Sequence, residues 1–156
     1  MADPPLLMQL LAVVAWLGSV AGATVIFRSL GHVGPEVVRK IVHIGTGNVI
    51  LLAWWLQVPA WMGITASILF SILTLLSYRY PVLPILDSVG RKSRGTFFYS
   101  ASIGILVALF WPNHHPEYAA IGILAMTWGD GLAAIIGQRW GTHRYEVLGM
   151  KKSWEG

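Results

Sequence analysis

The sequence predicts an all-α, polytopic membrane protein built as a bundle of transmembrane helices. Of its 156 residues, 55% are hydrophobic and 12% are charged, whereas about a quarter of the residues of soluble domains are charged. The apolar residues also gather in runs long enough to cross a bilayer. The absence of cysteine excludes disulfides and thiolate metal sites. In such a protein, the net charge of +4 reports membrane orientation and does not indicate a nucleic-acid partner.

Five apolar runs predict five spans within a single domain that covers residues 1–156, since no repeat or linker divides the chain. The first run lacks a preceding basic segment, so we expect a retained span and not a cleaved signal peptide. Pro35 and Glu36 suit the first turn of the helix that carries the second span. The spans are expected at about residues 6–27, 37–56, 61–78, 96–111 and 118–136.

The basic residues predict how these spans are oriented. All 11 Lys and Arg fall before or at the start of the second span, between the third and fourth spans, or after the fifth. By the positive-inside rule, the N-terminus lies outside and the three basic segments face the cytoplasm. We therefore expect an integral membrane protein whose polar, chemically active face is cytoplasmic.

Asp130 is a carboxylate inside the fifth apolar run. A charge there is costly in lipid, so it is a candidate functional residue; the alternative is a hydrogen-bonded side chain that fixes helix packing. Gly129 and Gly131 flank it and could loosen or break the helix, which would let backbone groups reach a ligand or metal. We expect this helix to break at Gly137.

Small residues recur every four positions in the same region, which places them on one stripe of a helix. The stripe could pack tightly against a neighbouring helix, or it could allow phosphates to approach the backbone. Neither a dinucleotide-binding fingerprint nor a phosphate-binding loop of the Walker type is present. The stripe comprises Gly129, Ala133, Gly137 and Gly141.

Arg39, Lys40 and His43 can share one face of the second span. They could be interfacial anchors plus a packed histidine, or they could pair with Asp130 from another helix. The cationic segment 91–94 could contact anionic lipids or hold a polyphosphate. Together, these groups suit phosphoryl or nucleotidyl transfer from a soluble nucleotide to a lipid-embedded acceptor.

Four motifs follow one another along the chain: Arg39-Lys40-Ile41-Val42-His43, Arg94-Gly95-Thr96, Gly129-Asp130-Gly131 continuing to Gly137 and Gly141, and Lys151-Lys152-Ser153-Trp154-Glu155-Gly156. In this order they resemble the polyprenol kinase family, which includes dolichol kinases, phytol kinases and CTP-dependent diacylglycerol kinases. The chain is most similar to the phytol kinase branch.

This resemblance implies transfer of the terminal phosphate of CTP, or of UTP or another nucleotide, to an isoprenoid alcohol such as phytol or geranylgeraniol. It implies a bacterial or cyanobacterial inner or thylakoid membrane, with the nucleotide, the alcohol and membrane lipids as partners. It also suggests Mg²⁺ as cofactor, held by Asp130 and Glu155. The implied catalytic residues are Asp130, His43 and Lys152. The implied nucleotide-binding residues are Arg39, Lys40, Arg94, Gly129, Gly131, Gly137, Gly141, Lys151, Ser153, Glu155 and Gly156.

Members of the family continue through further helices after the Lys-Ser-x-Glu-Gly segment, so we expect this chain to be a C-terminally truncated fragment whose last motif frays. Two other function classes stay open. One is another lipid-directed enzyme, either a CTP-dependent phosphatidate cytidylyltransferase or a diacylglycerol kinase. The other is a transporter-type bundle in which Asp130 and His43 form a proton or ion relay.

Overall fold

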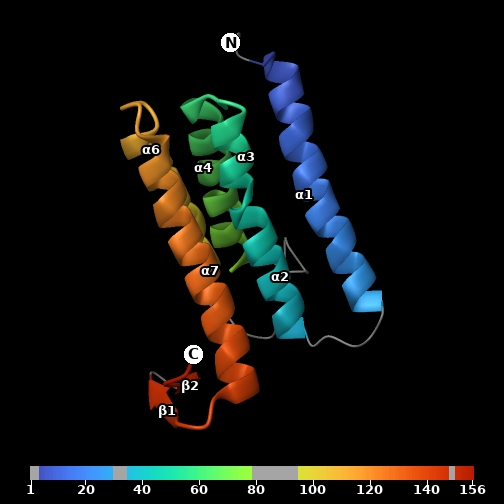
Figure 1. The fold of residues 1–156 in the computed structure, drawn as a ribbon, viewed down its shortest axis with the longest axis vertical. Coiled ribbons are helices and arrows are strands. Elements are labelled where there is room, and N and C mark those ends of the chain that lie inside the picture. The colour runs from blue at the N-terminus through green and yellow to red at the C-terminus, as the bar shows by residue number, and fades with distance from the viewer. Residues whose placement is uncertain (1–3, 30–34, 79–94, 148–149) are drawn as a thin grey trace. The chain divides into compact units, whose positions relative to one another are not determined.

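The computed structural model describes residues 4–29, 35–78, 95–147 and 150–156 (Figure 1). Within these ranges the chain is mostly helical, and a two-stranded antiparallel hairpin follows the last helix. The elements are α1 (Leu6–Ser29), α2 (Pro35–Gly47), α3 (Val49–Trp55), α4 (Ala60–Ser77), α6 (Gly95–Phe110), α7 (Pro116–Trp140), β1 (Arg144–Val147) and β2 (Met150–Ser153).

The predicted all-α, polytopic fold class is confirmed, because each of the five apolar runs is helical. Four described segments are long and apolar enough to cross a membrane: Leu6–Ser29, Val37–Trp55, Ala60–Ser77 and Pro116–Trp140. The fourth predicted span corresponds to α6, which is apolar but has only 16 residues. The helices thus lie close to the predicted span positions, but four described segments, and not the expected five, are long enough to cross a membrane.

The predicted break in the last helix is wrong. α7 runs without interruption for 25 residues, through both glycines that flank Asp130 and past Gly137 to Trp140. A helix satisfies its backbone groups internally, and each unpaired group in an apolar medium costs several kcal/mol. One glycine weakens a helix by only about 1 kcal/mol, which is too little to interrupt it there.

The prediction that the last motif frays is also wrong for the described residues. Strands β1 and β2 pair so that Tyr145 lies opposite Lys152 and Glu146 opposite Lys151. The backbone N–H of Trp154 extends this pairing by donating to the carbonyl of His143 at 3.1 Å. The hairpin supplies the backbone partners that a following helix was expected to provide.

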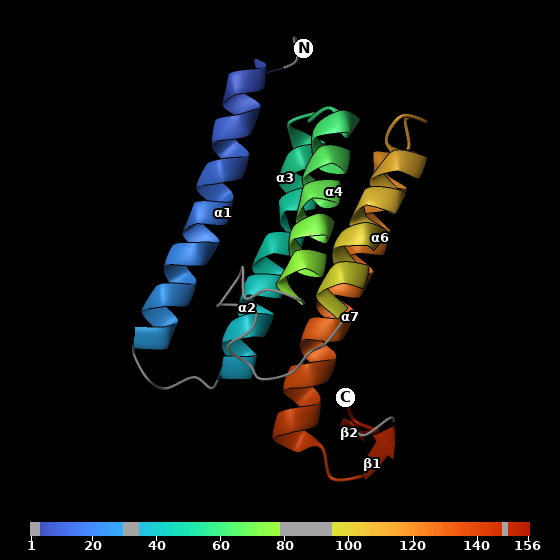
Figure 2. The same cartoon turned by 180° about the vertical axis from the view of Figure 1, so that it is seen from behind.

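The chain divides into two compact units, and we describe each by itself. The first comprises Met1–Val14 and Ile50–Ile123. In it, α4 and α6 run side by side (Figure 2) and exchange hydroxyl hydrogen bonds. Ser67 donates to the carbonyl of Ser100, and the hydroxyls of Ser71 and Ser100 lie 2.8 Å apart. Gly104 lies against the Ser67 side chain, so small residues bring the two helices close together.

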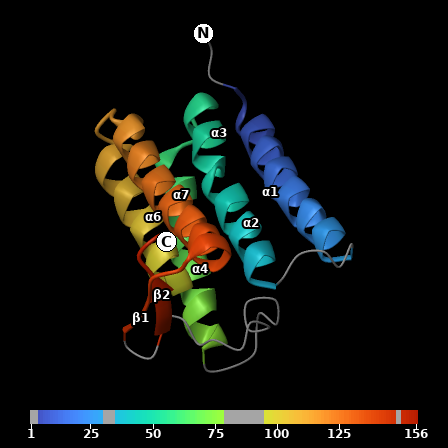
Figure 3. The same cartoon turned by 60° about the horizontal axis from the view of Figure 1, so that its bottom comes forward.

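The second unit comprises Ala15–Val49 and Leu124–Gly156. Tryptophan side chains tie its helices together. Trp16 of α1 donates to the carbonyl of Gly45 at 2.9 Å, and Trp128 of α7 donates to the side chain of Asn48 at 3.3 Å. The hairpin joins the end of α7 (Figure 3), and nearly all of the predicted site residues belong to this unit.

Candidate active site

A charged cluster joins α2 to α7 in the second unit. Lys40 and His43 are three residues apart, so they project from one face of α2, and both reach the carboxylate of Asp130 on α7. The ammonium of Lys40 donates to Asp130 Oδ2, and His43 Nε2 lies 3.5 Å from the same oxygen. His43 also hydrogen-bonds to the backbone of Met126, one helical turn before Asp130. The pairing expected between His43 and Asp130 is therefore present, and Lys40 joins it.

The members of this cluster differ in exposure. The side chain of Lys40 is 4% exposed, whereas that of Asp130 is 62% exposed. A buried ammonium costs several kcal/mol unless it is paired, so Asp130 serves as the counterion of Lys40. Because both contacts use Oδ2 and much of the carboxylate is exposed, Asp130 can still reach a ligand. Arg39, half-buried on the same helix, adds positive charge near His43 and Asp130.

The two glycines beside Asp130 have different surroundings. A Cβ at Gly131 would lie 2.6 Å from the end of the Ile44 side chain, so this glycine permits the close approach of α2 to α7. A Cβ at Gly129 would meet nothing within 4 Å. Gly131 therefore helps to set the distance between Asp130 and the cations of α2, while Gly129 has no such packing role in the described residues.

The small-residue stripe packs against the end of the chain. A Cβ at Gly137 would lie 3.0 Å from Ser153 Oγ and 3.4 Å from the Gly156 Cα, and a Cβ at Gly141 would lie 2.6 Å from Ser153 Oγ. Gly137 and Gly141 thus receive the Ser153–Gly156 segment, a partner that neither of the two sequence-based alternatives named, whereas Gly129 of the same stripe has no such neighbour.

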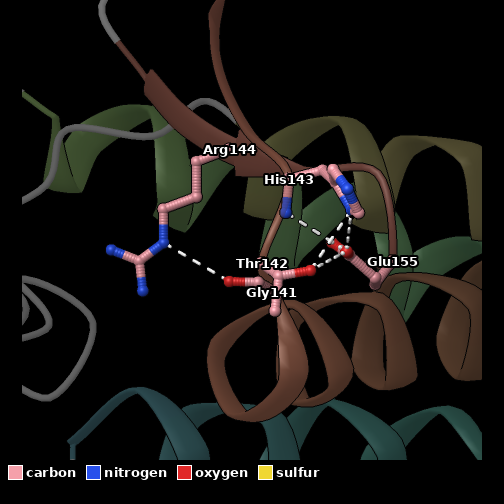
Figure 4. Close-up of polar contacts among 5 residues, drawn as sticks. All are labelled: Gly141, Thr142, His143, Arg144 and Glu155. Carbon is pink, nitrogen blue, oxygen red and sulfur yellow. Dashed lines mark hydrogen bonds and ion pairs between the residues drawn. The ribbon is translucent and has the colours of Figure 1, made fainter.

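A second polar cluster, Thr142, His143 and Glu155, closes the hairpin (Figure 4). Glu155 Oε1 accepts from the Thr142 hydroxyl at 2.7 Å and from the His143 backbone N–H at 3.2 Å, and it lies 2.7 Å from His143 Nδ1. The hydrogen bonds from Thr142 and His143 hold the pKa of Glu155 well below its ordinary value. Sequence reasoning missed Thr142 and His143, because neither residue belongs to a motif.

The remaining predicted residues are placed as follows. Lys152 is exposed on β2, while Ser153 beside it is buried. Lys151 lies opposite Glu146 in the strand register. Arg94 lies outside the described residues. The structure therefore brings Lys40, His43 and Asp130 together, and separately gathers Gly137, Gly141, Ser153 and Gly156.

The surroundings of Asp130 and Glu155 bear on the Mg²⁺ that the family resemblance implies. No group of three or more His, Asp or Glu side chains that could hold a metal occurs among the described residues. Mg²⁺, however, commonly uses one or two carboxylates together with substrate phosphates and water. The exposed carboxylate of Asp130 fits that requirement. Glu155 Oε1 already contacts Thr142 and His143, whereas Oε2 has no hydrogen-bond partner among the described residues. A site shared by Asp130 and Glu155 stays a prediction.

Comparison with known proteins identifies relatives among the phytol kinases. The chain is 55% identical over 141 residues to the phytol kinase of Synechocystis sp., an alignment that covers 90% of this chain and 60% of the relative. It is 28% identical over 164 residues to phytol kinase 1, chloroplastic, of Arabidopsis thaliana, and this alignment covers 93% of the chain and 52% of the relative. It is 29% identical over 137 residues to a probable chloroplastic phytol kinase of Triticum aestivum, and this alignment covers 76% of the chain and 42% of the relative.

No family model and no solved structure matches the chain. The chain spans between 42% and 60% of the length of the three relatives described. Over nine-tenths of its own length it is a homologue of phytol kinases, in agreement with the family resemblance of its motifs.

Proposed function

We propose that this chain, a homologue of phytol kinases, is part of a membrane kinase that transfers the terminal phosphate of a nucleotide to an isoprenoid alcohol. Phytol and geranylgeraniol are the acceptors we propose, and CTP is the donor. The observation that carries the proposal is the paired Lys40–Asp130 cluster, with His43 beside it, in a chain 55% identical to a phytol kinase.

Asp130 supplies a carboxylate that can act as the general base in such a reaction. As the alcohol oxygen bonds to phosphorus, its proton passes to the Asp130 carboxylate, and the bond from the terminal phosphorus to the nucleoside diphosphate breaks. Mg²⁺ bound at the same carboxylate would neutralise charge on the nucleotide phosphates. Lys40 and His43 hold the carboxylate in place before the substrates arrive.

Cations supply the complementary phosphate contacts. In a transferring phosphoryl group, negative charge spreads over oxygens that positive side chains stabilise. Lys151, Lys152 and Ser153 follow α7 on the hairpin, and Arg39 lies on α2 near the cluster. We propose that they bind the nucleotide on the cytoplasmic face, because the basic segments are expected on that face.

Other activities would give different products. A phosphatidate cytidylyltransferase would release pyrophosphate and leave the nucleotide on the lipid, whereas a kinase releases the nucleoside diphosphate. A diacylglycerol kinase would phosphorylate a different alcohol, and a transporter would leave the lipid unchanged. The identity to a phytol kinase favours the kinase with an isoprenoid acceptor.

The experiment uses membranes that contain the full protein, with CTP, UTP or ATP labelled in the terminal phosphate, and with phytol or geranylgeraniol. We expect label in a lipid phosphate and a loss of roughly 10³-fold in Asp130→Asn, the scale typical of a lost catalytic group. Glu117→Gln is the matched control, because it removes a carboxylate from the first turn of the same helix and should keep activity.

Asp130→Asn also leaves the buried Lys40 without its counterion, so the double variant Lys40→Met/Asp130→Asn tests folding separately from chemistry. It should fold as well as the wild type and remain inactive. Release of labelled pyrophosphate, or no lipid label with any of the three nucleotides from folded wild-type protein, would overturn the proposed function.

A further inference from the structure

The carboxylate of Glu155 joins the two ends of the hairpin that follows α7. α7 ends at Trp140, and Thr142 and His143 stand between it and β1. Glu155 comes two residues after β2 ends and bonds back to both of them, at 2.7 Å from the Thr142 hydroxyl and 3.2 Å from the His143 N–H. These contacts join the chain entering the hairpin to the chain leaving it.

A second set of contacts holds the same segment on α7. Ser153 is 7% exposed, and its hydroxyl lies where a Cβ at Gly137 or Gly141 would collide with it. The Gly156 backbone also packs on Gly137, where an added Cβ would lie 3.4 Å from the Gly156 Cα. The segment is therefore fixed on both sides of Glu155, while Lys152 on β2 remains exposed.

We propose that Glu155 is a positioning residue, which acts through Thr142 and His143 to hold Lys152 and Ser153 against the end of α7. Its role in this proposal differs from the metal ligand that the family resemblance implied. The proposal rests on the proposed function, since Lys152 and Ser153 are positioned there for the phosphates of the nucleotide.

The contacts of one carboxylate oxygen favour closure. Oε1 accepts from the Thr142 hydroxyl and the His143 N–H and lies 2.7 Å from His143 Nδ1. Hydrogen bonds to a carboxylate are among the stronger ones in proteins, so they hold Glu155 in place. Oε2 has no hydrogen-bond partner among the described residues, so the experiment has to separate closure from metal binding. An amide at this position could still accept from Thr142 and from the His143 N–H, but it would be a poor ligand for Mg²⁺ in place of a carboxylate. Glutamine therefore separates the two roles.

The experiment compares Glu155→Gln and Glu155→Ala in the full protein, in membranes. We expect Glu155→Ala to raise the KM for the nucleotide about tenfold, the scale of one lost hydrogen bond to a charged group, with a smaller change in kcat. Glu155→Gln should restore most of that loss, and the magnesium concentration for half-activation should not change. Thr142→Val should resemble Glu155→Ala, and the two together should cost little more than either alone.

Hydrogen exchange of the β1 and β2 amides provides the readout that does not depend on activity. Exchange should become about tenfold faster in Glu155→Ala, and much less so in Glu155→Gln. Glu146→Gln is the matched control, since it removes the other carboxylate of the hairpin without touching the closure. It should leave both exchange and nucleotide KM near those of the wild type.

Two outcomes would overturn the proposal. One is unchanged exchange in Glu155→Ala. The other is a Glu155→Gln variant as inactive as Glu155→Ala with a raised magnesium requirement, which would identify Glu155 as a metal ligand. Failure of the proposed function would give a different result, because the wild-type protein would then phosphorylate no alcohol. The hydrogen-exchange data would still report whether Glu155 closes the hairpin.

Discussion

Polar side chains join helices in both units of the molecule, but their chemistry differs. Between α4 and α6, the contacts are neutral: Ser67 donates to a Ser100 backbone carbonyl, and the Ser71 and Ser100 hydroxyls pair at 2.8 Å. Between α2 and α7, the contact is ionic, with a buried Lys40 on an exposed Asp130. The hydroxyls satisfy one another within the packed helices, whereas the ion pair leaves part of its carboxylate open.

This difference separates packing from function. Hydrogen bonds between helices in membrane proteins are worth only about 0.6 kcal/mol on average, so neutral hydroxyl pairs refine an interface without dominating it. An ionised pair in an apolar helix costs far more to maintain and is retained mainly where chemistry needs it. The α2–α7 contact is thus the functional candidate, and the α4–α6 contact is a structural one.

The largest expected effect on stability follows from the unequal burial of Lys40 and Asp130 in their ion pair. Asp130→Asn leaves the buried Lys40 without a counterion and should destabilise the protein by about 3 kcal/mol. This value is the lower end of the range for broken buried pairs, because Asp130 is itself exposed. Lys40→Met leaves a carboxylate that water can reach and should cost less. Thermal unfolding in detergent measures both, and equal losses would contradict the asymmetry.

A glycine pair on α7 gives an intermediate effect. A Cβ at Gly137 would lie 3.0 Å from Ser153 Oγ, so Gly137→Ala must displace this buried hydroxyl and should cost about 1 kcal/mol, the low end for overpacking. Gly129→Ala is the matched control, because the site is open and alanine favours a helix by about 1 kcal/mol over glycine. We therefore expect opposite shifts in melting temperature. A destabilised Gly129→Ala would show that this glycine has a packing partner.

The smallest effect is expected at the hydroxyl contact. Ser71→Ala should lower stability by about 1 kcal/mol or less, because it removes one neutral hydrogen bond between helices, and it should leave kinase activity intact. Ser19→Ala is the control, since within the described residues its hydroxyl donates to the carbonyl of Trp16 on its own helix. A loss of activity in Ser71→Ala comparable to that in Asp130→Asn would erase the distinction between the two regions.

Much of the candidate site could be predicted from the sequence, because its signals are local. Helical spacing placed Lys40 and His43 on one face, and the cost of a carboxylate in lipid identified Asp130 as their partner. The surroundings of Glu155 could not be predicted in this way. Its contacts with Thr142 and His143 join residues 12 and 13 positions apart across a hairpin that no apolar pattern indicates.

The sequence by itself determined the helical fold class and the approximate limits of the spans, since a membrane helix must be apolar over its whole length. It also determined which residues could be ionised within those spans. Only the tertiary structure decided that α7 continues through its glycines, that the glycine stripe receives Ser153, and that Glu155 closes a hairpin. Those outcomes depend on backbone hydrogen bonds and close contacts between distant segments, which composition and spacing do not encode.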